Sequence, residues 1–152
     1  MLAFIHEVST EVMDIDNNPS EILSLDNYQP SEFLSKLCQK VSRADSETIY
    51  WYYEFGLAIT IHLNELIGNG QKKAWETLNN EVLSYFSHFS PQTTLPTVKD
   101  RMKKGRNMYD LFSVIGAFRI HRICTFSANK VSSFTKDEIT FIKSKVTNPG
   151  AP

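Results

Sequence analysis

The segment ETIYWYYEFGLAITIHLNELI, residues 47–67, decides the fold class of this 152-residue chain. Its apolar side chains recur on every side of a helix instead of forming one stripe, so we expect this helix in the centre of a bundle or shared with another subunit. Ser46 is expected to cap its beginning, and Gly68-Asn69-Gly70 provides residues suited to a left-handed cap at its end. The charged residues Glu54 and Glu65 argue against a membrane span here.

Amphipathic patterns on either side of this segment predict further helices. Thr97–Asp100 and Thr135–Glu138 each match a capping box, and Ser31 and Ser127 are suited to cap two other helices. Gly105 weakens its helix by about 1 kcal/mol relative to alanine, so a turn is expected to be tolerated there. The helices are expected at residues 31–43, 47–67, 71–86, 97–112, 127–131 and 135–145.

These patterns, without a convincing strand pattern, predict an all-α fold, a compact bundle of about six helices. Residues 127–146 are expected to form two short helices joined by a turn. That layout is compatible with a helix-turn-helix-like C-terminal part and equally with a plain helical hairpin.

The composition divides the chain into three parts. Residues 1–29 contain six acidic residues and no Lys or Arg, which predicts an acidic flexible arm. The alternative for this part is an ordinary terminal helix docked on the core, because apolar residues recur there at spacings of three or four. Residues 30–146 are predicted to form a single helical domain, and residues 147–152 a disordered tail.

The charge is distributed unevenly along the chain. Residues 1–90 contain five basic and 13 acidic residues, a net charge of −8, whereas residues 91–152 contain 11 basic and four acidic residues, a net charge of +7. This asymmetry indicates either a polyanionic partner for the basic half or attraction between the two halves on folding.

The sequence contains no recognisable catalytic or metal-binding arrangement, so we expect neither enzymatic activity nor a cofactor. The four histidines are scattered, no glycine-rich phosphate loop is present, and Glu54 and Glu65 lie about three helical turns apart. Cys38 and Cys124 are each surrounded by apolar residues, so both are expected to be buried thiols in a reducing intracellular compartment, the nucleus or the cytoplasm.

Basic residues of the second half are the candidates for nucleic-acid binding. At 100° per residue, Lys99, Lys103 and Arg106 fall within an arc of about 60° on one side of their helix. Lys136, Lys143 and Lys145 are expected to extend this surface, and Asp110 is expected to pair with Arg106. The alternative is a solvated helix face without a partner. The candidate binding residues are Lys99, Lys103, Lys104, Arg106, Asn107, Arg119, Arg122 and Lys130.

The order of motifs between residues 50 and 109 resembles a known bacterial domain. An aromatic helix with an early glycine (Tyr53, Gly56) is followed by a glycine turn, an amphipathic helix ending in Phe86, and a basic helix with Arg106-Asn107-Met108-Tyr109. This order is similar to the helical N-terminal domain of restriction-like (PD-(D/E)XK) nuclease-family DNA-processing proteins. The nuclease half and its catalytic acids are missing here, so the resemblance implies DNA binding or assembly, not cleavage.

Two functions are therefore expected for this chain. The first is a non-enzymatic helical module that binds nucleic acid, DNA in particular, through the basic half as part of a larger assembly. The alternative is a helical adaptor or oligomerisation subunit that binds protein partners, with a homodimer through residues 47–67. The two are compatible, because a dimer presents two basic faces.

Overall fold

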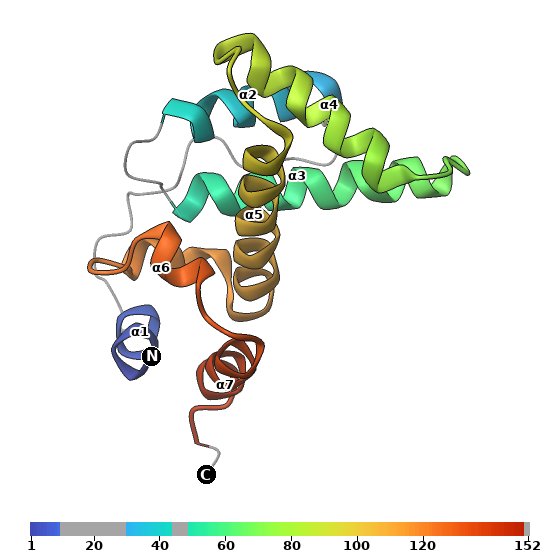
Figure 1. Ribbon diagram of the computed structural model, residues 1–152. Coiled ribbons are helices and arrows are strands. Elements are labelled where there is room, and N and C mark those ends of the chain that lie inside the picture. Colours follow the sequence, from blue (N-terminus) through green and yellow to red (C-terminus); the bar gives the residue numbers. More distant parts are fainter. Residues whose placement is uncertain (10–29, 44–48, 151–152) are drawn as a thin grey trace.

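The computed structural model describes residues 1–9, 30–43 and 49–150, without the side chains of residues 30–31 and 40–43. The regular secondary structure of these described residues consists of helices without strands, which confirms the predicted all-α fold (Figure 1). In chain order the elements are α1 (Leu2–Ser9), α2 (Pro30–Arg43), α3 (Ile49–Gly68), α4 (Ala74–Phe89), α5 (Leu95–Ile115), the 3-10 helix η2 (Ala117–Arg122), α6 (Ala128–Ser132) and α7 (Lys136–Thr147).

The crossing of α3 and α5 is the centre of the fold (Figure 1). The two backbones touch where Gly56 of α3 meets Gly105 of α5, and a Cβ atom on Gly56 would overlap the carbonyl oxygen of Gly105. Gly105 is buried at this contact, and α5 continues through it without a turn. The turn that the weak helix propensity of Gly105 would allow does not form, because the residue serves close helix packing instead of a break.

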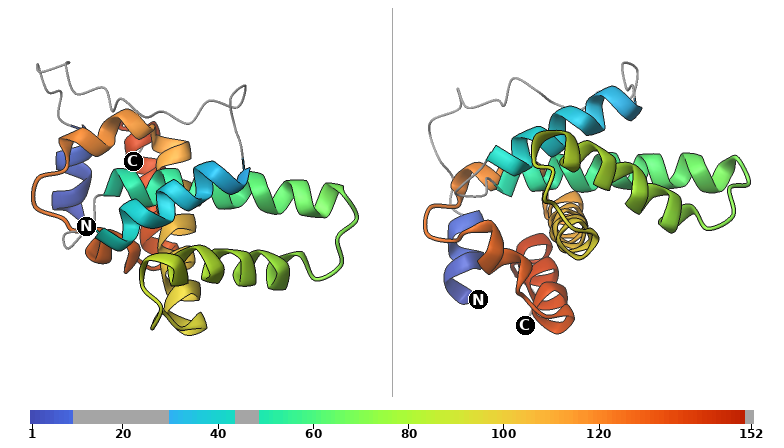
Figure 2. Two further views of the ribbon diagram at one scale, coloured as in Figure 1. Left: turned by 90° about the horizontal axis from the view of Figure 1, so that it is seen from above. Right: turned by 45° about the horizontal axis from the view of Figure 1, so that its top comes forward.

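Helices α2 and α4 cover α3 on the sides that α5 leaves open. Figure 2 shows α3 and α4 running side by side as an antiparallel pair. Leu34 and Leu37 of α2 and Leu78 and Val82 of α4 are fully or almost fully buried in this layer. The central position expected for residues 47–67 holds only for the first half of α3, because its buried residues end at Ile59 and Ile67 is 56% exposed. A shared subunit interface stays a prediction.

An aromatic cluster within the hydrophobic core joins α1 to the second half of the chain. Phe4 of α1 is completely buried, and its ring lies 5.3 Å from the ring of Phe126, 5.2 Å from that of Phe134 and 6.5 Å from that of Phe112. Residues 1–9 therefore form a docked helix, not the beginning of a loose arm. The rest of the expected acidic arm, residues 10–29, lies outside the described residues.

Polar contacts add to the docking of α1. The carboxylate of Glu7 accepts hydrogen bonds from the backbone N–H groups of Cys124 and Thr125 and from the Thr125 hydroxyl. Burial opposes ionisation of Glu7, but these hydrogen bonds outweigh it and lower the pKa of the carboxyl below its ordinary value of 4.5.

The observed helix caps agree with some of the expected helix starts and differ from others. Ser127 accepts from the N–H of Lys130, and Thr135 and Glu138 form a complete capping box, so both caps are confirmed. Thr97 is not a cap, because Thr94 accepts from its N–H and α5 begins at Leu95. Pro96 fits this earlier start, since the first helical turn tolerates a missing N–H. The expected cap at Ser46 lies outside the described residues.

Cys38 is fully buried, but Cys124 is exposed, which corrects the expectation of two buried thiols. Cys124 lies in the irregular segment between η2 and α6, where its apolar neighbours in sequence do not enclose it. Within the part of the chain that the structure describes, no helix combines the length and apolar character required to cross a bilayer.

Candidate nucleic-acid interface

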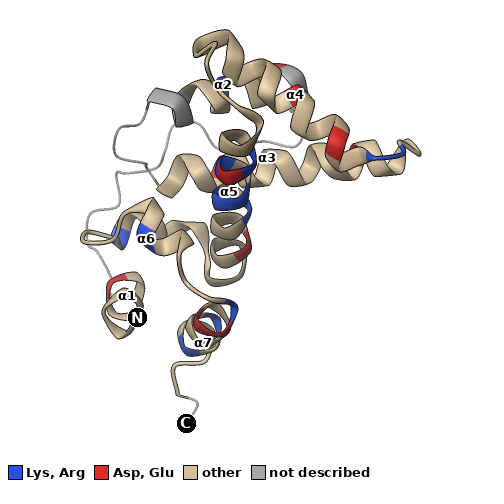
Figure 3. Ribbon diagram, viewed as in Figure 1, with Lys and Arg blue, Asp and Glu red and all other residues tan. Residues whose placement is uncertain are grey.

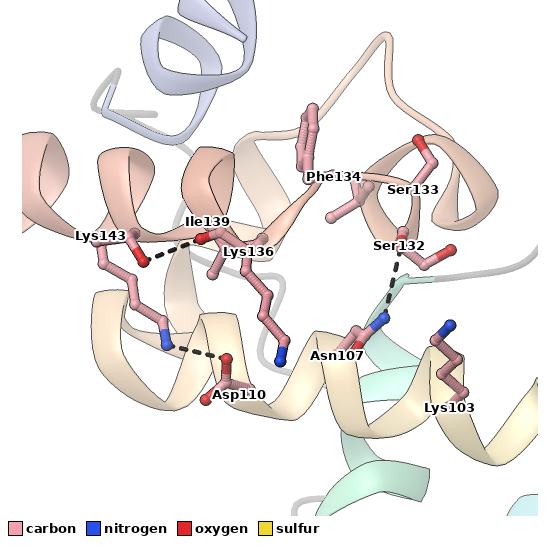
Figure 4. Close-up of a pocket in the computed structure, with 11 residues that line it drawn as sticks. Lys103, Asn107, Asp110, Ser132, Ser133, Phe134, Lys136, Ile139 and Lys143 are labelled. Carbon is pink, nitrogen blue, oxygen red and sulfur yellow. Dashed lines mark hydrogen bonds and ion pairs between the residues drawn. The ribbon is translucent and has the colours of Figure 1, made fainter.

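A groove lies where α5 meets the α6–α7 turn and the first half of α7 (Figure 4). Its volume is about 610 Å³. The lining residues are Lys103, Asn107, Asp110, Val131, Ser132, Ser133, Phe134, Lys136, Ile139, Thr140 and Lys143. Of the eight residues expected to bind nucleic acid, the structure brings Lys103 and Asn107 into this groove.

Two polar contacts join the walls of the groove. The side-chain amide of Asn107 donates to the backbone carbonyl of Ser132 at 3.4 Å, which links α5 to the α6–α7 turn. The ammonium of Lys143 lies 2.9 Å from the Asp110 carboxylate, which links α7 to α5 (Figure 4). The pair expected between Asp110 and Arg106 is therefore replaced by one across two helices.

Two further lysines of the groove have no such partner. Lys136 extends from α7 toward α5 and ends between Asp110 and Asn107, whereas Lys103 lies on the other side of Asn107 (Figure 4). Both residues are exposed, and neither forms an ion pair with a described residue. The two ammonium groups therefore provide positive charge that is not neutralised at short range in this part of the molecule.

The other cations of α5 differ in what they contact. Lys99 is exposed and has no ion pair among the described residues, so it continues the charge of Lys103 one turn earlier along α5. Lys104 pairs with Asp100 at 3.3 Å. The guanidinium of Arg106 stacks over the ring of Trp75 in α4, 4.6 Å from its centre. Figure 3 shows Lys and Arg along α5 and on α7, interspersed with acidic residues.

Arg119 and Arg122 lie away from the groove and bind the backbone of α1. Both donate to the carbonyl of Val8, at 2.8 Å and 3.0 Å, near the end of α1. Arg119 also donates to the carbonyl of Ile115 at 2.7 Å, at the end of α5. The structure thus assigns these two guanidiniums a capping role at helix C-termini. Lys130 of α6 is exposed and does not line the groove.

The sequence predicts Lys136 and Lys143 as an extension of the basic surface, whereas it gives no indication of Ser132 and Ser133. The positions of these residues depend on how α7 folds back against α5. Lys143 and Asp110, for example, pair although they are 33 residues apart in the sequence. The capping box at Thr135 was the one sequence signal for this geometry, because it fixes where α7 begins relative to α6.

A second polar cluster joins α3 to α4. His62 Nε2 lies 2.6 Å from one carboxylate oxygen of Glu81, and the Tyr85 hydroxyl donates to the other at 2.7 Å. This arrangement resembles a base held by an acid, but no serine, cysteine or threonine is hydrogen-bonded to His62 in the described structure. We interpret it as a polar tie between the two helices.

Metal binding finds no support in the described residues, which contain no group of three or more His, Cys, Asp or Glu placed to hold an ion. Comparisons with protein families, with curated proteins and with solved structures found no match to this chain. The function is therefore argued from the geometry of the groove.

Proposed function

We propose that this protein is a non-enzymatic module that binds nucleic acid through the groove between α5 and α7. The observation that carries the proposal is the pair Lys103 and Lys136, two ammonium groups on facing helices without an ion pair among the described residues. A concave site with excess positive charge attracts anions, and phosphate contacts from lysine supply most of the non-specific affinity for nucleic acid.

The electrostatic origin of this affinity makes it depend on salt. Each phosphate that a lysine neutralises releases counterions, so the logarithm of the association constant falls linearly with the logarithm of the salt concentration. Lys99 and Lys103 lie one helical turn apart on α5, and Lys136 faces Lys103 from α7, so about three phosphate contacts are expected. The corresponding slope is about −2 to −3.

The proposal is tested by titrating fluorescently labelled DNA at several salt concentrations and measuring anisotropy. The double variant Lys103→Ala/Lys136→Ala is expected to weaken binding at low salt and to reduce the salt slope by about 1 for each lysine. The matched control, Lys36→Ala/Lys72→Ala, removes the same charge from exposed sites on α2 and on the turn before α4. Equal losses in both variants, or no binding by the unaltered protein at low salt, would contradict the proposal.

A second candidate function is a helical adaptor that binds a protein partner. The observation in its favour is apolar exposure at the junction of α5 and η2, where Val114 is 49% and Phe118 58% exposed. Light scattering of the unaltered protein and of Phe118→Ser tests for self-association through this junction. A concentration-dependent increase in mass that Phe118→Ser abolishes would support the adaptor function, and a constant monomer mass would oppose a homodimer there.

A further inference from the structure

We infer that the groove accepts a single strand of nucleic acid rather than a duplex, with one backbone phosphate between Lys103 and Lys136. This inference rests on the proposed function and specifies the class of ligand. It follows from the size of the groove, the chemistry of its floor and rim, and the charges next to it.

The size of the groove favours one strand. Its volume of about 610 Å³ falls within the range of about 300–1,000 Å³ that is typical of pockets for small ligands. Such a space accommodates a nucleotide or two of a single strand. A duplex is too wide to enter, so it is restricted to contacts with the outer rim.

The floor of the groove is suited to a base or a sugar. Val131 is buried, and Phe134 and Ile139 are partly buried, so the lining includes apolar side chains, although the Phe134 ring also packs on Phe4. Proteins that bind single strands combine a positively charged path for the backbone with apolar or aromatic contacts to the bases, which a duplex keeps stacked inside.

The rim of the groove provides acceptors for a base edge as well as donors for a phosphate. The hydroxyls of Ser132 and Ser133 donate to carbonyls of their own turn, at 3.0 Å and 2.6 Å, which leaves their oxygens as acceptors. The side-chain amide nitrogen of Asn107 donates to the carbonyl of Ser132. The side-chain oxygen of Asn107 is therefore a further acceptor near the two ammonium groups. An unpaired base can use these acceptors, because its amino and imino groups are not engaged with a complementary strand.

The surroundings of α7 disfavour a duplex. α6 has only five residues, and the first turn of α7 carries the exposed Asp137 and the partly buried Glu138, whose carboxylate accepts from the Thr135 N–H. A recognition helix in a major groove contacts the DNA mainly through its N-terminal residues, and there the Asp137 carboxylate would repel the phosphates of the DNA. A single strand inside the groove is expected to follow Lys136, Lys103 and then Lys99 along α5.

A substitution that fills the groove without changing its charge distinguishes binding of a single strand inside the groove from binding of a duplex at its rim. Thr140 lines the groove from the exposed side of α7, so Thr140→Trp narrows the space and leaves every lysine in place. Asn80→Trp, at an exposed position of α4, is the matched control for a surface tryptophan. Circular dichroism confirms that both variants fold.

The assay compares a labelled ten-nucleotide oligothymidylate with a labelled ten-base-pair hairpin at the same low salt concentration. The single strand is expected to bind at least about fivefold more tightly than the hairpin, because base contacts add to the phosphate contacts. Thr140→Trp is expected to weaken single-strand binding about tenfold or more and to leave weak hairpin binding unchanged, whereas Asn80→Trp changes neither.

The possible failures are distinguishable. Salt-dependent hairpin binding that equals or exceeds single-strand binding, with no effect of Thr140→Trp, would overturn the single-strand inference and leave the proposed function standing. No binding of either probe at low salt would overturn the proposed function itself.

Discussion

Replacement of Gly56 by alanine is expected to destabilise the whole domain, because α3 and α5 touch at this residue. A Cβ atom at Gly56 would overlap the backbone carbonyl of Gly105 and lie 2.9 Å from the Cβ of Tyr109. Neither obstacle is the end of a flexible side chain, so neither can rotate away. The two helices would have to separate by roughly 1 Å or more along their most extensive contact.

The size of the effect follows from two opposing contributions. Overpacking of a dense core costs typically about 1–3 kcal/mol and sometimes more, and a rigid backbone obstacle places Gly56→Ala at the upper end. Alanine has a better helix propensity than glycine, which restores about 1 kcal/mol. We therefore expect a net loss of about 2 kcal/mol or more, which corresponds to a fall in Tm of about 4–8 °C for a chain of this size.

Urea unfolding followed by circular dichroism measures this loss, and two other glycines calibrate it. At Gly105 a Cβ would meet Phe55, Gly56 and Tyr52 atoms at 3.0–3.2 Å, so Gly105→Ala is expected to cost less, about 1 kcal/mol. At Gly68, the last residue of α3, nothing lies within 4 Å, so Gly68→Ala is expected to be neutral or slightly stabilising. If Gly56→Ala is as stable as Gly68→Ala, the close crossing of α3 and α5 is refuted.

The remaining predictions concern α1 and the cysteines. Phe4→Ala removes a fully buried ring and is expected to cost about 3–5 kcal/mol in urea unfolding; a loss below about 1 kcal/mol would show that α1 is not docked. The lowered pKa of Glu7 stabilises the folded state above its ordinary value of 4.5, and this contribution disappears as pH falls through the lower folded value. Glu7→Gln is expected to flatten that part of the stability–pH curve, and an unchanged curve would exclude the hydrogen bonds as its cause. Burial raises the pKa of the Cys38 thiol, whereas Cys124 is exposed, so a thiol reagent at neutral pH should label one cysteine rapidly and the second only on unfolding. Rapid labelling of both would contradict the burial of Cys38.

The candidate site shows where local patterns stop being informative. Helical periodicity placed Lys99, Lys103 and Arg106 on one side of a helix, and this local geometry needs no knowledge of other elements. The same periodicity does not predict which other helix each of these side chains contacts. Arg106 stacks on Trp75 of α4, whereas Lys103 faces α7. A count of basic residues does not separate Arg119 and Arg122 from the lysines of the groove, although both arginines donate to the carbonyl of Val8.

By itself, the amino-acid sequence determined the all-helical architecture, the caps at Ser127 and Thr135 and the central position of the first half of α3, because these depend on hydrogen bonds and apolar periodicity within one segment. Only the tertiary structure decided that Gly105 is a packing residue, that α1 docks through Phe4, and that Lys136 lies opposite Lys103. These features arise between segments distant in the chain. Their geometry is set by which buried surfaces fit together, a property that spacing along one helix does not encode.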